Sequence, residues 1–148
     1  MKTEKLIHII ILITKLPAEL FRYVNEYYDF DKGYYYDKIE NIIREHKIRQ
    51  NGFYCSKNSH FITDFKSDFK KENYNNIIQC IFEIPIILET SKRIYKVGSY
   101  EGKHVLENFR GDSYISNGEF IIAMILCGYS FRKYGLNCIF KAKYKTRI

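Results

Sequence analysis

The sequence predicts an α+β protein: a mainly helical N-terminal part, followed by a winged-helix-like module made of a helix-turn-helix and a β-hairpin. Three observations support this. Ser116 and Glu119 have the spacing of a capping box, in which each residue accepts a hydrogen bond from the other's backbone amide. Gly128 stands where a left-handed helix stop belongs. Basic, strand-like residues follow from 130 to 145, with a turn expected at residues 134–137.

The length of 148 residues suits one compact domain. Hydrophobic residues make up 46% of the chain, enough for a buried core, and the 28% of charged residues argues against intrinsic disorder. Within this single unit we expect a mainly helical N-terminal region, residues 1–92, and the winged-helix-like module with its basic hairpin, residues 93–148.

The chain begins with its most apolar run, residues 6–13. A transmembrane helix needs about 20 apolar residues, so we expect a buried strand or helix here and no membrane span. No small-residue cleavage site follows, which argues against a secretory signal. Whether the run packs within the chain or against a second copy stays open, as does a homodimer. Residues 16–28 have the spacing of an amphipathic helix with a proline near its first turn.

The next segments alternate between helical and strand patterns. Asp37 and Glu40 predict a capped helix start, and this helix is expected to end near residues 51–52. Short strands are expected at residues 53–55 and 60–62.

Further along, the run 74–82 predicts a buried helix, which we expect Pro85 to end. Residues 93–97 alternate polar and apolar side chains, which predicts a strand leading into the final module. A helix over 99–109 and a break at 110–112 complete the pattern.

The net charge of +7 is concentrated at the C-terminal end. Residues 1–127 carry 18 Lys and Arg against all 17 carboxylates, whereas residues 128–148 carry no carboxylate and six cations: Arg132, Lys133, Lys141, Lys143, Lys145 and Arg147. Such a positive end attracts phosphate backbones, acidic protein surfaces or anionic lipids. A solvated edge hairpin whose lysines oppose aggregation is the other interpretation, and it stays open.

The helix expected at residues 117–127 is apolar on all sides after Glu119, as a core helix is. Base-specific recognition by this helix is therefore not expected, because a base-reading helix exposes polar side chains. Sequence-independent phosphate contact by the six cations remains. Lys141, Lys143 and Lys145 alternate, so on a strand they would project to one side. The 14 tyrosines accompany 23 isoleucines and 17 lysines, a bias typical of AT-rich codons, so we do not count them as a nucleic-acid signal.

No catalytic constellation is visible, and we expect a protein that is not an enzyme, with no metal site and no cofactor. His104 and Glu107 are three apart on one helix face and could form an acid/base couple, but a surface ion pair is the favoured interpretation. The four cysteines have no short pair spacing, which argues against a zinc site. We expect reduced thiols in an intracellular protein.

The stretch Gly98-Ser-Tyr-x-x-Lys-His-Val-x-Glu107, followed by Tyr114-Ile-Ser-Asn-Gly-Glu-Phe-Ile-x-Ala-x-x-x-x-Gly-Tyr129, resembles small uncharacterised proteins of phages and large DNA viruses. The resemblance covers about the last third of the chain. It implies a viral setting, inside an infected cell or in a virion, and no catalytic residues. In that pattern a bulkier residue is usual where this chain has Gly102.

Taken together, the sequence predicts a small, basic, non-enzymatic viral protein that associates with DNA or RNA through its C-terminal hairpin. Binding would be electrostatic and weakly selective for sequence. The alternative is a protein-interaction module, either a virion component or a binder of a host factor, whose partner offers an acidic surface.

Overall fold

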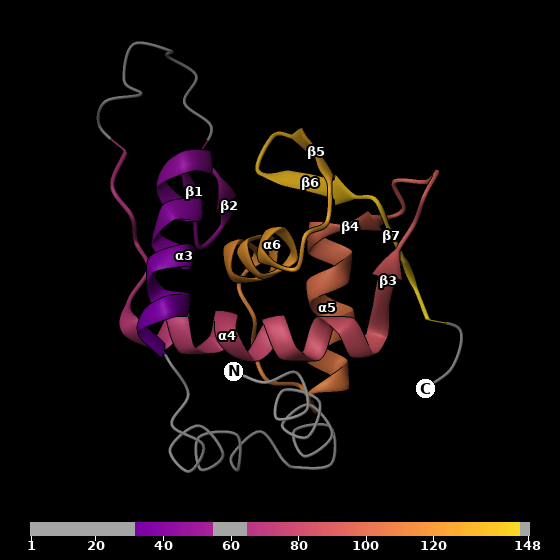
Figure 1. The fold of residues 1–148 in the computed structure, drawn as a ribbon, viewed down its shortest axis with the longest axis horizontal. Coiled ribbons are helices and arrows are strands. Elements are labelled where there is room, and N and C mark those ends of the chain that lie inside the picture. Colours follow the sequence, from indigo (N-terminus) through magenta and orange to yellow (C-terminus); the bar gives the residue numbers. More distant parts are fainter. Residues whose placement is uncertain (1–31, 55–64, 146–148) are drawn as a thin grey trace.

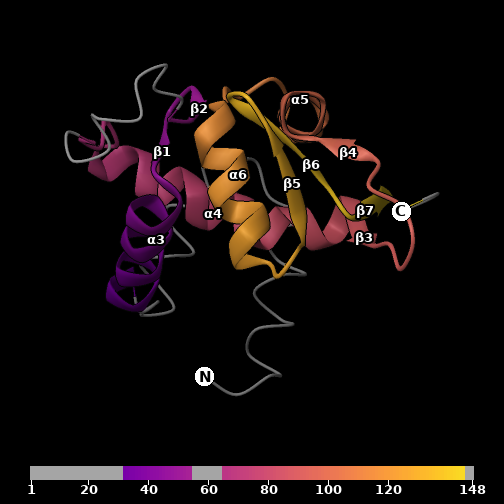
Figure 2. The ribbon, with the colours of Figure 1, turned by 90° about the horizontal axis from the view of Figure 1, so that it is seen from above.

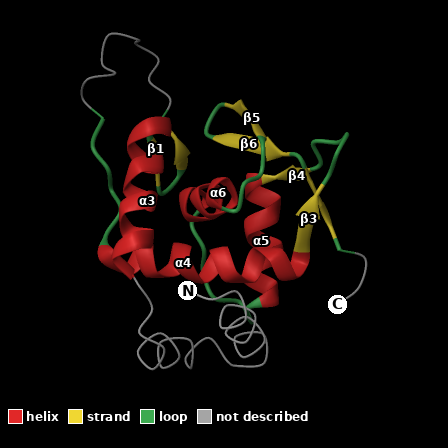
Figure 3. Cartoon of the chain, viewed as in Figure 1, coloured by secondary structure: helices red, strands yellow, loops and turns green. Residues whose placement is uncertain are grey.

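The structure, a computed structural model, describes residues 32–54 and 65–145. Its helices are α3 (Lys32–His46), α4 (Lys71–Ile87), α5 (Ser99–Phe109) and α6 (Asn117–Leu126). Its strands are β1 (Ile48–Arg49), β2 (Gly52–Phe53), β3 (Leu88–Thr90), β4 (Val97–Gly98), β5 (Phe131–Tyr134), β6 (Asn137–Phe140) and β7 (Ala142–Tyr144). The predicted α+β class is confirmed (Figure 3).

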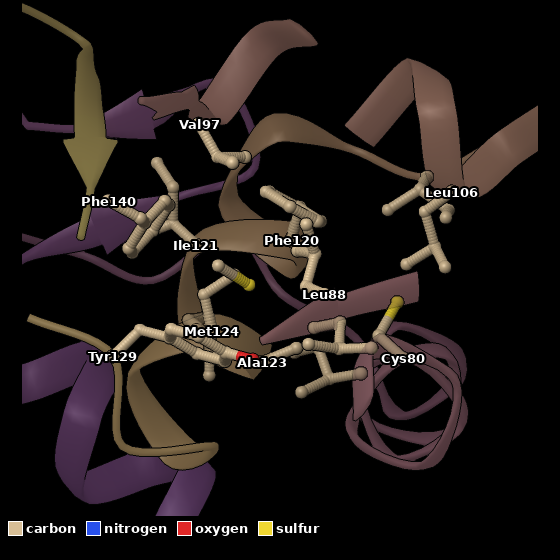
Figure 4. Packing of buried hydrophobic residues seen from close by; sticks show 14 of the residues in the cluster. Cys80, Leu88, Val97, Leu106, Phe120, Ile121, Ala123, Met124, Tyr129 and Phe140 are labelled. Carbon is tan, nitrogen blue, oxygen red and sulfur yellow. The ribbon is translucent and has the colours of Figure 1, made fainter. Parts of the chain in front are cut away.

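Helix α6 is the centre of the fold. Figure 1 shows it end-on, with α4 below it, α3 and α5 on its two sides, and the hairpin β5–β6 above. Every residue from Asn117 to Met124 is buried, because the sequence of this helix is apolar on all sides. Figure 4 shows Phe120 and Ile121 among side chains from the surrounding elements. The prediction that this helix is core is confirmed.

The start and end of α6 follow the predicted local chemistry. The Glu119 amide donates to Ser116 Oγ at 3.1 Å, and the Ser116 amide donates to Glu119 Oε1 at 2.7 Å. Gly128 has φ +89°, the left-handed conformation in which a helix commonly ends. Both predictions are confirmed, and so is the hairpin turn, which lies at Gly135 and Leu136.

The described residues form three small antiparallel sheets, two of which join distant parts of the chain. The largest has the strand order β4-β6-β5, in which Val97 pairs with Phe140, and Phe140 pairs with Phe131. Strand β3 pairs with β7 and β1 with β2. The order of helices and hairpin agrees with the predicted module, while its winged-helix character stays a prediction. Because β3 precedes residue 93 and β7 follows it, both expected regions contribute to one body.

Two helix boundaries differ from the sequence prediction. Asp37 does not cap a helix, since α3 begins at Lys32 and ends at His46, earlier than expected. Lys47 follows with φ +52°, which turns the chain into β1. The expected face is present, with Ile39 and Ile43 buried.

Pro85 does not end α4, which continues to Ile87. Proline in a helix removes one amide donor and leaves a carbonyl four residues earlier without its usual bond. Here that carbonyl belongs to Ile81, and Cys127 Sγ lies 3.6 Å from its oxygen. The last turn of α4 therefore tolerates the proline, because a side chain from the end of α6 approaches the freed carbonyl.

The predicted strands are shorter or differently paired. The strand expected at 93–97 is reduced to Val97–Gly98, and the strand expected at 53–55 is Gly52–Phe53, paired with β1. The elements expected at 6–13, 16–28 and 60–62 lie outside the described residues. Among the helices that the structure describes, none has the length and apolar character needed to cross a bilayer.

Candidate nucleic-acid interface

The predicted cations fall at different places in the fold. Arg132 and Lys133 are exposed on β5, an edge strand of the three-stranded sheet. Lys141 lies at the bend between β6 and β7, Lys143 is in β7, and Lys145 follows that strand. Arg147 lies outside the described residues. Figure 2 shows the hairpin beside α6, with β7 beyond the end of β6.

The three lysines expected in one row meet three different partners. Lys143 forms an ion pair with Glu89 on β3, with Nζ and Oε1 3.4 Å apart. Lys145 donates to the Pro85 carbonyl at 2.6 Å. Lys141 instead approaches an aromatic ring near the three-stranded sheet. Of these lysines, Lys141 is therefore the one that lies with Arg132.

The ring that joins these two cations is Tyr95, in the segment before β4. The Arg132 guanidinium lies 4.1 Å from the ring centroid, and Lys141 Nζ lies 5.9 Å from it. Both distances fall within the range in which a cation is attracted by the ring's electrons. Sequence reasoning missed Tyr95, because the tyrosines were discounted as compositional bias.

The register of the sheet extends this cluster. Arg132 pairs with Ile139, and Ile139 with Gly98, so the three lie in one row across the sheet. Tyr134 is two residues beyond Arg132 and shares its side of β5. We call this surface, with Tyr95 and Lys141, the outer sheet face: Tyr95, Gly98, Arg132, Tyr134, Ile139 and Lys141.

The opposite side of the same sheet is core. Phe131, Phe140 and Val97 occupy the alternate positions and pack toward α6. Lys133 points to this side at the sheet edge, where its Nζ lies 4.5 Å from the Phe53 ring centroid. Alternation along β5 thus separates Arg132 from Lys133.

The Tyr134 side chain extends along the outer sheet face. Its hydroxyl oxygen is 3.7 Å from the position that a Cβ on Gly98 would occupy. Gly98 is on β4, two strands away from β5, a separation of roughly 10 Å at the usual strand spacing. The ring must therefore extend across β6 instead of standing upright. Tyr134 is 55% exposed, so one side of its ring faces solvent.

The predicted contact between His104 and Glu107 is confirmed. His104 Nδ1 lies 2.9 Å from Glu107 Oε1, and Lys103 Nζ lies 3.2 Å from the same oxygen. Lys103 also donates to the Ile115 carbonyl at 3.2 Å, and the Ile115 amide donates to Glu107 Oε2 at 3.4 Å. These contacts connect the segment before α6 to α5, so the Glu107 carboxylate has a structural role.

The described cysteines are poor nucleophiles. Burial raises the pKa of Cys80, Cys127 and Cys138 to about 12, so their thiols stay protonated at neutral pH. Cys55 lies outside the described residues. Within the parts of the chain that the structure describes, no group of His, Cys, Asp and Glu is arranged to hold a metal ion.

Comparisons with protein-family models, with curated proteins and with solved structures find no match to this chain.

Proposed function

We propose that this protein is a non-enzymatic nucleic-acid-binding protein that contacts phosphates through its C-terminal hairpin and the outer sheet face. The observation that carries the proposal is the cluster at Tyr95, where Arg132 from β5 and Lys141 from the bend between β6 and β7 approach one ring. Lys133, at the edge of the same sheet, adds a third cation.

These cations are available to a ligand. Within the described residues, Arg132, Lys133 and Lys141 have no carboxylate partner, in contrast to Lys143 with Glu89. Two like charges near one ring repel each other, and a phosphate between them relieves that repulsion. The surplus of six cations over residues 128–148 adds long-range attraction for a polyanion.

The proposed binding is insensitive to sequence. Helix α6 is buried from Asn117 to Met124 and offers no exposed face to a DNA groove. Phosphate contacts supply affinity without reading bases, and they weaken as salt rises. The viral resemblance in the last third of the chain supports an intracellular setting, in an infected cell or a virion.

Charge reversal tests the proposal. The double variant Arg132→Glu/Lys141→Glu is compared with wild type for binding of fluorescent DNA and RNA at low salt. The matched control, Lys66→Glu/Lys71→Glu, makes the same change in net charge at exposed positions at and before the start of α4, outside both the hairpin and the outer sheet face. We expect the first variant to lose at least tenfold in affinity and the control to lose little. An equal loss of affinity in the two variants would refute the assignment of binding to the outer sheet face.

Exposed aromatic residues favour a second candidate, a protein-interaction module. Tyr100 and Tyr114 are 59% and 70% exposed, and Phe109 is 39% exposed. Aromatic residues are enriched at protein interfaces. A stoichiometric protein complex that survives nuclease treatment and is lost in Tyr100→Ser/Tyr114→Ser would support this candidate, and wild-type failure to bind nucleic acid at low salt would favour it over the first.

A further inference from the structure

We infer that the outer sheet face binds single-stranded nucleic acid, with one base stacked on Tyr134 and a neighbouring base on the guanidinium of Arg132. This inference rests on the proposed function and specifies its ligand. It begins from the two planar groups that alternate along β5.

Tyr134 provides the first platform, an exposed aromatic ring on which a base can stack. Its hydroxyl reaches to 3.7 Å from the Cβ position of Gly98, so the ring lies along the sheet, and 55% of the residue is exposed. The hydroxyl end of the ring lies at ordinary van der Waals distance from that position. A buried tyrosine would have no ring face accessible to a base. A tyrosine side chain pointing into solvent would lose conformational freedom when a base bound to it.

Arg132 is the second platform. Its guanidinium lies 4.1 Å from the Tyr95 ring centroid, a distance at which the cation contacts the ring. Arg132 is exposed, so part of the guanidinium stays accessible to a base. Bases stack on arginine planes as well as on aromatic rings, and the Tyr95 ring limits the freedom that Arg132 would lose on binding.

The side-by-side arrangement of the two platforms distinguishes single strands from duplexes. Both platforms lie on one face of the sheet, whereas bases in a duplex strand are stacked on each other about 3.4 Å apart. Two neighbouring bases can therefore meet both platforms only when they are unstacked from each other. Bases in a duplex are stacked and paired, so this surface favours an unpaired strand. Lys141, whose Nζ lies 5.9 Å from the Tyr95 ring centroid, is placed for a phosphate of that strand.

A tryptophan reporter tests the inference directly. The chain contains no tryptophan, so Tyr134→Trp introduces a single indole at the platform, and Tyr114→Trp introduces one at an exposed control site outside the outer sheet face. We expect single-stranded DNA to quench the emission of Tyr134→Trp strongly and to leave Tyr114→Trp almost unchanged. Equal quenching at both positions would overturn the stacking arrangement.

Affinity measurements separate stacking from charge. Tyr134→Ala should lower single-strand affinity about 5- to 150-fold, the range for loss of one stacked base, with no change in salt dependence. Tyr134→Phe should retain affinity, and Arg132→Lys should lose it although the charge remains. Duplex binding should be weaker than single-strand binding and indifferent to Tyr134→Ala.

The outcomes distinguish this inference from the proposed function. If wild type binds duplex as tightly as single strand, and Tyr134→Ala has no effect while Arg132→Glu/Lys141→Glu abolishes binding, phosphate binding stands and the stacking inference is overturned. If wild type binds neither ligand at low salt, both are refuted. A protein partner lost in Tyr134→Ala would likewise overturn the inference, by assigning the face to a different ligand.

Discussion

Replacing Arg110 with methionine should destabilise the protein strongly and in a pH-dependent way. Arg110 ends α5, and its side chain is only 1% exposed. Its Nε donates to both carboxylate oxygens of Glu83 on α4, at 2.7 and 3.0 Å, and its terminal nitrogens reach Asn76 and Cys80. Arg110→Met keeps much of the volume but leaves the Glu83 carboxylate buried without its cation.

The expected loss in free energy of unfolding is about 3 to 5 kcal/mol at pH 7, the usual cost of removing one partner from a buried pair. Against a typical total of about 5 to 15 kcal/mol, this is a large fraction. The exposed pair Arg44–Glu40, with nitrogen and oxygen 2.8 Å apart, provides the matched control. Arg44→Met should cost less than about 1 kcal/mol, because water screens that pair.

The pH dependence identifies the cause. Burial raises the pKa of Glu83 to about 6, against the opposing effect of Arg110, and loss of Arg110 raises it further. A raised carboxyl pKa contributes stability at low pH that is lost as pH rises through the folded-state pKa. In wild type this loss is complete a little above pH 6, whereas in the variant it continues to higher pH. The gap between the two proteins should therefore widen by up to about 1 kcal/mol from pH 6 to pH 7, since a full pKa unit is worth about 1.4 kcal/mol and wild type still loses part of it in this range.

Urea unfolding followed by circular dichroism at several pH values measures both effects. The double variant Glu83→Gln/Arg110→Met should recover part of the stability and lose the pH-dependent gap. A loss in Arg110→Met as small as that in Arg44→Met, or a gap that does not change with pH, would refute the description of this contact as a buried ion pair.

Three further predictions concern packing, capping and thiol chemistry. Gly102→Ala should lower stability by about 1 to 3 kcal/mol, because the new Cβ would lie 2.6 Å from the Phe120 ring; an unchanged melting temperature would contradict this. Ser116→Ala should cost about 1 kcal/mol through loss of the α6 cap, and Ser116→Thr should restore most of it in the same unfolding assay. In a Cys55→Ser background, thiol reagents should react slowly with the folded protein and rapidly in urea; fast reaction without denaturant would contradict the burial of Cys80 and Cys138, the partial burial of Cys127 and the raised pKa of their thiols.

Local chemistry explains which elements were predictable. The capping box at Ser116, the stop at Gly128 and the turn at Gly135 each depend on residues within a few positions of one another. Gly102 shows the limit of local reasoning. The absence of a side chain there is explained by Phe120, which lies against the α5 backbone and is known only from the packed structure.

Long-range pairing explains what was missed. Strand β3 exists because β7 returns to pair with it, and neither segment has a pattern that identifies its partner. The candidate site shows the same limit. The charge of Arg132 and Lys141 was visible in the sequence, but Tyr95 could not be linked to them, because the contact depends on how β4, β5 and β6 are ordered in the sheet.

Salt dependence of binding tests the central claim most directly. Wild-type protein is titrated into a fluorescent single strand of about 16 nucleotides, the upper end of common site sizes, at increasing salt. Three phosphate contacts, from Arg132, Lys133 and Lys141, predict a slope of about −2 for log affinity against log salt, at about −0.7 for each contact. Binding with that slope would support the phosphate contacts. No binding at about 50 mM salt, or an affinity that salt does not change, would contradict them.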